Sequence, residues 1–108
     1  MSAFKPLGNT TCISVTVTAS TGVQVGVPSA MANCYMLVNT GTVPVFIGTD
    51  TTAALALVDA VIPVVGTPSG AYCIPPNIPV YIDDDVADFF SVICSATASL
   101  YITPGRLV

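Results

Sequence analysis

Apolar and polar residues alternate with a period of two along several short stretches of the chain. Within residues 11–18, Ile13, Val15 and Val17 fall on one side and the intervening cysteine, serine and threonines on the other. This alternation is typical of a strand with one buried face. Residues 23–27 repeat it after a short turn, so the two stretches together predict a β-hairpin.

The middle of the chain predicts two more strands. Residues 34–39 are apolar on both faces, which indicates a central strand covered on both sides, or one whose outer face meets a partner. A turn rich in hairpin residues, 39–42, leads to a second strand over residues 43–48. Pro44 should stand at the start of this strand or place it at a sheet edge, since proline cannot donate to a ladder.

Residues 51–65 are ambiguous. Thr51 or Thr52 could cap a short helix through Leu57, whereas residues 58–65 look more like a strand. We expect an irregular segment followed by a strand here.

The remainder of the chain predicts four short strands. They cover residues 71–74, 80–82, 90–95 and 99–103. In the last of them Leu100 and Ile102 should point inward, and Pro104 with Gly105 should end the strand.

About eight short strands separated by turns of Gly, Pro and Thr indicate an all-β fold, either an antiparallel β-sandwich or a jelly-roll-like barrel. A length of 108 residues suits one domain with one core, so we expect a single β-domain over residues 1–108. Residues 1–10 could form an extended N-terminal arm, or a simple N-terminal strand.

Charged residues are scarce, and this scarcity limits the classes of binding partner that we expect. Apolar residues make up 53% of the chain and charged residues 7%, so apolar surface is left over and self-association into a homo-oligomer is expected. The only cations are Lys5 and Arg106, which excludes the basic patch that a nucleic-acid partner requires. The longest apolar region, residues 53–65, is interrupted by Asp59 and Pro63, so no membrane partner is expected.

The chain offers little catalytic chemistry. It has no histidine to act as a general base, no Gly-rich phosphate loop, and only two cations to activate a thiol. We therefore expect no enzymatic activity, no catalytic residues and no cofactor.

Cysteines and aspartates are the candidate metal ligands. Cys12, Cys34, Cys73 and Cys94 are widely spaced with no CxxC pair, so reduced core cysteines are expected. Asp83, Asp85 and Asp88 could offer oxygen ligands to calcium, but residues 83–88 lack the glycine and distal glutamate of an EF-hand loop. A solvated loop is the favoured interpretation, and these three aspartates remain weak metal candidates.

Two tyrosines are predicted to face outward. Tyr81 and Tyr101 have the opposite parity to the inward residues of their strands. Outward tyrosines favour a subunit contact over a sugar-binding site, because aromatic side chains are enriched at protein interfaces.

Three segments resemble small bacteriophage virion proteins encoded among head and tail structural genes. Ala3-Phe4-Lys5-Pro6-Leu7-Gly8 looks like their short N-terminal arm. Residues 37–47 (LVNTGTVPVFI) and 98–105 (ASLYITPG) are similar to their paired strands.

The resemblance implies a capsid cement or head-decoration protein that stabilises the head by binding the major capsid protein, often as a trimer. Such a protein would be located in the virion and assembled in the host cytoplasm. Phe4, Pro6 and Leu7 would be available to dock into a neighbour. Two alternatives remain open: a knob, adaptor or spike component of the tail, and a calcium-dependent carbohydrate-binding module that uses the outward tyrosines and the aspartates.

Overall fold

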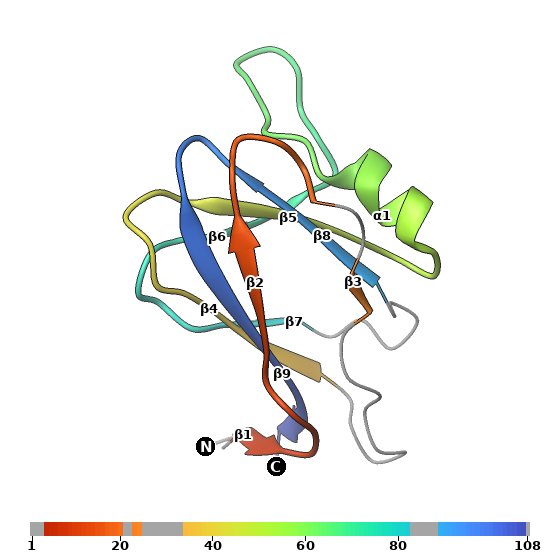
Figure 1. Cartoon of the computed structure of the whole chain (residues 1–108), viewed down its shortest axis with the longest axis vertical. Helices are drawn as coiled ribbons and strands as arrows, with labels where there is room; N and C mark the ends of the chain where they lie inside the picture. The colour runs from red at the N-terminus through yellow and green to blue at the C-terminus, as the bar shows by residue number, and fades with distance from the viewer. Residues whose placement is uncertain (1–3, 21–22, 25–33, 83–88, 108) are drawn as a thin grey trace.

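The computed structural model describes residues 4–20, 23–24, 34–82 and 89–107. Its strands form two antiparallel sheets that pack face to face (Figure 1). Sheet A contains β1 (Phe4–Pro6), β2 (Thr11–Val15), β4 (Cys34–Asn39), β7 (Val80–Ile82) and β9 (Ala98–Leu107); sheet B contains β3 (Val23–Gln24), β5 (Val45–Asp50), β6 (Tyr72–Ile74) and β8 (Phe89–Cys94). One short helix, α1 (Ala53–Asp59), completes the described elements. The predicted all-β sandwich is confirmed.

The strands pair in a nested order. β2 pairs with β9, β3 with β8, β4 with β7, and β5 with β6, so the chain forms one long antiparallel ribbon. The ribbon is rolled up so that β9 also pairs with β4, and β8 with β5. The resulting sheets, β2-β9-β4-β7 and β3-β8-β5-β6, have the strand order of a jelly roll.

The predicted hairpin between residues 11–18 and 23–27 is wrong. β2 lies in sheet A and β3 in sheet B. After Val15 the chain crosses between the sheets along β8: the Cys94 N–H donates to the Thr16 carbonyl at 3.0 Å, and the Ser20 N–H donates to the Val92 carbonyl at 3.0 Å. Residues 25–27 lie outside the described part of the chain.

The middle hairpin expected over residues 37–47 is also wrong, because β4 and β5 belong to opposite sheets. The fully buried Asn39 holds the crossing. Its side-chain amide donates to the carbonyls of Val43 (2.7 Å) and Ile74 (3.1 Å), and its Oδ1 accepts from the Gly41 N–H at 2.8 Å. Pro44 directly precedes β5, as expected for a strand start, but β5 is an interior strand between β8 and β6.

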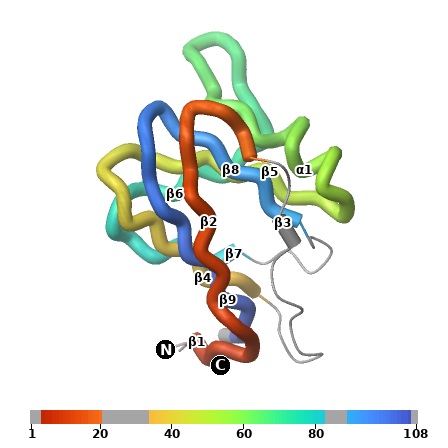
Figure 2. Tube along the Cα trace, viewed as in Figure 1, coloured from red at the N-terminus to blue at the C-terminus, as the bar shows by residue number. Residues whose placement is uncertain are grey.

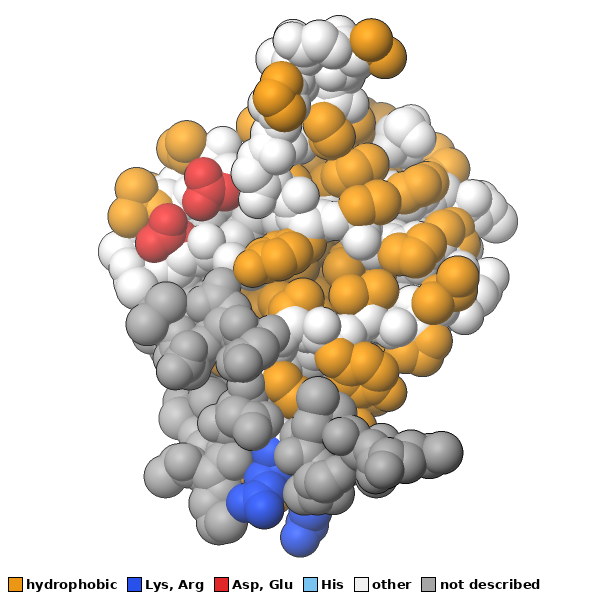
Figure 3. Space-filling view, turned by 180° about the vertical axis from the view of Figure 1, so that it is seen from behind, with side chains coloured by type: hydrophobic (Ala, Val, Ile, Leu, Met, Phe, Trp, Pro, Cys, Tyr) orange, Lys and Arg blue, Asp and Glu red, His pale blue; other side chains and the backbone are white. Residues whose placement is uncertain are grey.

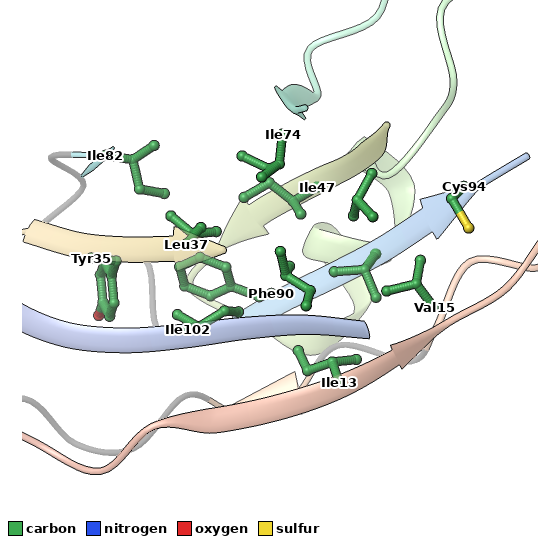
Figure 4. Packing of buried hydrophobic residues seen from close by; sticks show 13 residues of the cluster. Ile13, Val15, Tyr35, Leu37, Ile47, Ile74, Ile82, Phe90, Cys94 and Ile102 are labelled. Carbon is green, nitrogen blue, oxygen red and sulfur yellow. The ribbon is translucent and has the colours of Figure 1, made fainter. Parts of the chain in front are cut away.

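The core lies between the two sheets, where side chains from both inner faces interdigitate (Figure 4). Ile13, Val15, Leu100 and Ile102 are buried there as predicted. Val17, expected on the same face, is 64% exposed because the chain has left sheet A after Val15.

Residues 58–65 do not form the expected strand. Instead Thr52 caps α1, its side-chain oxygen accepting from the Leu55 N–H at 3.3 Å, and the helix continues through Asp59. A loop follows whose tip is a tight turn: Val64 and Thr67 exchange backbone hydrogen bonds of 2.9 and 3.2 Å. Gly66 adopts φ +83° within this turn, a conformation that glycine adopts without strain.

β9 does not end at Pro104 as expected; it runs on to Leu107 and pairs there with β1. The Pro104 carbonyl accepts from the Leu7 N–H at 2.9 Å. Because the N and C=O of one strand residue point to the same side, the missing N–H of Pro104 faces the connection between β1 and β2 and not β4. The paired β1 and the end of β9 bring both ends of the described chain to one end of the molecule (Figure 2).

Candidate protein-binding face

The outer face of sheet A carries a set of apolar and aromatic side chains. Strand register places them in rows: Cys12, Tyr101 and Val38 are neighbours across β2, β9 and β4, and Met36 lies opposite Tyr81 across β4 and β7. They alternate with the buried residues of the same strands, so they point away from the core. We call these five residues the tyrosine face.

The two predicted outward tyrosines are exposed, Tyr81 by 46% and Tyr101 by 39%. Among the side chains that the register places on this side of sheet A, none is charged. A polar member, Thr103, is buried, and its hydroxyl shares a 2.8 Å hydrogen bond with that of Thr10. The use of Tyr81 and Tyr101 as an interface stays a prediction.

The N-terminal residues contribute to the edge of this face. β1 pairs with the end of β9, Phe4 opposite Leu107 and Pro6 opposite Gly105. The Phe4 ring packs on Tyr81, with ring centroids 5.5 Å apart and planes tilted by 45°. Thus the residues predicted as an arm form a strand on their own domain, with Phe4 and Leu7 half-buried and Pro6 exposed. Their docking into a neighbour remains a prediction.

Tyr101 and Cys12 interact on the tyrosine face. The side-chain hydrogen bond with Cys12 raises the pKa of Tyr101 above its ordinary value of 10.0, and negative charge on the Cys12 thiolate acts in the same direction. The phenol is therefore neutral throughout the physiological pH range. A neutral phenol can donate a hydrogen bond to a partner as well as offer its ring.

Only two of the four cysteines are core residues. Cys34 and Cys94 are buried, whereas Cys12 and Cys73 are exposed. Cys12 lies on the tyrosine face, and Cys73 lies on the edge strand β6 of sheet B, opposite Phe46. The prediction of core cysteines is therefore wrong for these two, because alternation in β2 and β6 turns their side chains outward.

A second apolar surface lies on α1. The helix buries Ala56 and rests on Gly48 of β5, where an added Cβ would lie 2.4 Å from the Ala56 carbonyl oxygen. The larger side chains consequently face outward. Their exposed fractions are 49% for Leu55, 39% for Leu57, 70% for Val58 and 50% for Val61, and we call these four residues the α1 face.

The predicted calcium ligands Asp83, Asp85 and Asp88 lie outside the described residues. Within residues 4–20, 23–24, 34–82 and 89–107, no three His, Cys, Asp or Glu side chains gather as a metal site would require. None of the helices in this part of the chain is long and apolar enough to span a membrane.

Sequence reasoning identified part of the tyrosine face. Tyr81 and Tyr101 were predicted from parity, whereas Met36 and Val38 were not named and Cys12 was expected in the core. The apolar character of both faces of residues 34–39 was the available signal for Met36 and Val38.

Comparison with known proteins adds no further assignment: the chain matches no protein-family model, no curated protein and no solved structure.

Proposed function

We propose that the protein is a structural protein of a bacteriophage particle, a capsid cement or head-decoration protein that self-associates and binds the major capsid protein through the tyrosine face. The observation that carries the proposal is the uncharged, aromatic outer face of sheet A. The central part of a protein interface is depleted of charge and enriched in Tyr, Phe and Met; the tyrosine face carries no charge, and three of its five residues are Tyr or Met. Tyrosines are also frequent among the residues that dominate binding energy.

The arrangement of the phage-like segments supports the same proposal. Residues 4–6 form β1, residues 98–105 belong to β9, and residues 37–39 end β4; these three strands are neighbours in sheet A. The first and last of the three segments thus lie in the sheet that presents the tyrosine face, whereas the middle segment continues into β5 of sheet B. Jelly rolls occur in viral capsid domains, although they also occur in lectins, so the fold alone assigns no function.

A cosedimentation experiment tests the proposal. Capsid shells of the phage that carries this gene, prepared without the protein, are mixed with native protein or with the Tyr81→Ser, Tyr101→Ser double variant. We expect the double variant to lose at least about tenfold in affinity, since one interfacial anchor typically contributes 1 to 2 kcal/mol or more. Tyr72→Ser is the matched control, because Tyr72 is 41% exposed but lies in β6 of sheet B.

Equal binding of the double variant and the control would overturn the role of the tyrosine face. Failure of native protein to bind any shell would overturn the decoration role itself. Antibody labelling of intact particles separates the head from the tail alternative: a decoration protein labels the whole head, whereas a tail component labels one vertex.

A further inference from the structure

The α1 face is an apolar surface with an acidic border. Asp50 is the last residue of β5, Asp59 is the last residue of α1, and both are partly exposed. They flank the helix whose Leu55 and Val58 are exposed by 49% and 70%. Because the whole chain has only two basic residues, and both lie at its two ends, no cation in this part of the sequence offsets the two carboxylates.

Both basic residues lie side by side elsewhere on the molecule. Lys5 and Arg106 are direct partners in the β1–β9 register, on the strands that carry the two ends of the chain. Like charges directly opposite each other destabilise a strand pair. In the part of the chain that the structure describes, neither is paired with Asp50 or Asp59, and the basic and acidic side chains occupy separate areas of the surface (Figure 3). We call β1 with residues 105–107 of β9 the terminal ribbon.

The terminal ribbon has two different sides. Phe4 and Pro6 share a side with Gly105, the side of the tyrosine face, and alternation places Lys5 and Arg106 on the other. Lys and Arg can lay their aliphatic stems along apolar surface while their charged ends reach an anion. Such a pair matches the α1 face, which offers exposed Leu and Val side chains on a helix with a carboxylate before its start, Asp50, and one at its end, Asp59.

We propose that the terminal ribbon of one copy docks on the α1 face of a second copy, with Lys5 and Arg106 directed to Asp50 and Asp59. This inference specifies the self-association contained in the proposed function and rests on it. Each copy has a net charge of -4, so a contact that brings its two cations to carboxylates of the next copy lowers the charge repulsion between copies. The contact joins two different surfaces, so repetition builds a ring if the rotation closes. It leaves the tyrosine face free for the capsid.

Charge substitutions test the contact in sedimentation experiments on the full chain. Lys5→Gln with Arg106→Gln changes the net charge from -4 to -6 (no cations and six aspartates). Thr18→Asp with Thr97→Asp also gives -6 (two cations and eight aspartates), at exposed positions in the β2–β3 and β8–β9 connections. We expect the glutamine pair to raise the self-association Kd by about tenfold or more, and the aspartate control by much less.

A charge exchange within one chain completes the test. Lys5→Asp, Arg106→Asp, Asp50→Lys and Asp59→Lys together leave the net charge at -4 (two cations and six acids) and should restore native self-association. Thermal unfolding verifies that each variant folds. Equal weakening by the aspartate control, or failure of the exchanged variant to associate, would overturn the inference. A monomeric native chain would overturn it too, whereas shell binding by that monomer would leave the capsid-binding part of the proposed function intact.

Discussion

The outer faces of the two sheets of the jelly roll are covered to different extents. On sheet B, α1 covers Gly48 and its neighbours, and the helix replaces part of the sheet surface with exposed Leu and Val. On sheet A, the described part of the chain places only β1 at the margin, and the tyrosine face lies open. Because α1 buries the small Ala56 and leaves its leucines and Val58 exposed, it covers sheet B but presents a new apolar surface of its own. The molecule therefore has one aromatic, uncharged surface and one aliphatic surface with an acidic border.

The largest expected loss of stability comes from a side chain at Gly48, where α1 packs closely on the outer face of sheet B. Gly48→Ala would place a Cβ 2.4 Å from the Ala56 carbonyl oxygen and 2.6 Å from the Ala60 nitrogen, both backbone atoms. We expect a loss of about 2–3 kcal/mol in the free energy of unfolding, because α1 must move off sheet B. Denaturant titration measures it, with Gly70→Ala as control, since a Cβ at Gly70 meets nothing within 4 Å. Equal stability of the two variants would contradict this account.

A smaller effect is expected at the open face. A Cβ at Gly105 would lie 2.4 Å from both the Lys5 carbonyl oxygen and the Phe4 ring. Gly105→Ala should loosen β1 at a cost of about 1–2 kcal/mol, less than at Gly48 because β1 is a short strand at the sheet margin. Chymotrypsin should then cut after Phe4 faster than in native protein, as followed by mass spectrometry. Unchanged cleavage would show that β1 accommodates the methyl group.

The exposed thiols report on the two faces separately. In the free protein, Cys12 and Cys73 should react rapidly with a maleimide, whereas the buried Cys34 and Cys94 should react at least about 100-fold more slowly, through local opening. On capsid shells, Cys12 should become protected and Cys73 should stay reactive. Protection of Cys73 alone would place the capsid contact on sheet B.

The smallest expected effect is a change in the pKa of Tyr101 on the tyrosine face. Cys12→Ala removes the hydrogen bond and the thiolate that raise the pKa of Tyr101, so this pKa should fall toward 10.0. Absorbance at the phenolate band during alkaline titration measures the change against native protein. An unchanged titration of Tyr101 would mean that Cys12 does not govern it.

Alternation along the sequence predicted which side of a strand is buried but not which strand lies beside it. Ile13, Val15, Leu100 and Ile102 are buried as expected, because side-chain parity is a local property. The partners of β2 and β4 were wrong, because turn residues favour pairing with the next strand, whereas the jelly roll sends the next strand to the opposite sheet. Buried Asn39, which fixes one crossing, gives no periodic signal.

The predictions for two local segments, residues 51–65 and the end of β9, were wrong. An irregular segment followed by a strand over residues 58–65 was expected, with Thr51 or Thr52 only as a possible helix cap; the Thr52 cap and the space above Gly48 favour the helix, which continues through Asp59. Proline normally ends a strand because it has no N–H to donate. In β9 the side of Pro104 that lacks the N–H faces the connection between β1 and β2, so the pairing with β4 is kept and β9 continues. The tyrosine face was partly predictable from parity, whereas the α1 face depended on knowing that the helix rests on glycine.

The nested strand order has a consequence for how the protein is made. β2 emerges from the ribosome before its partner β9, which is the last of the described strands, and β3 and β4 likewise pair with strands from the second half of the chain. Only β5 and β6 can pair soon after synthesis. Until these partners have been synthesised, unpaired strands this apolar are prone to aggregation. Synthesis of β9 (Ala98–Leu107) is thus required before β2 can pair: a chain cut before β9 has no native partner for β2 and no terminal ribbon.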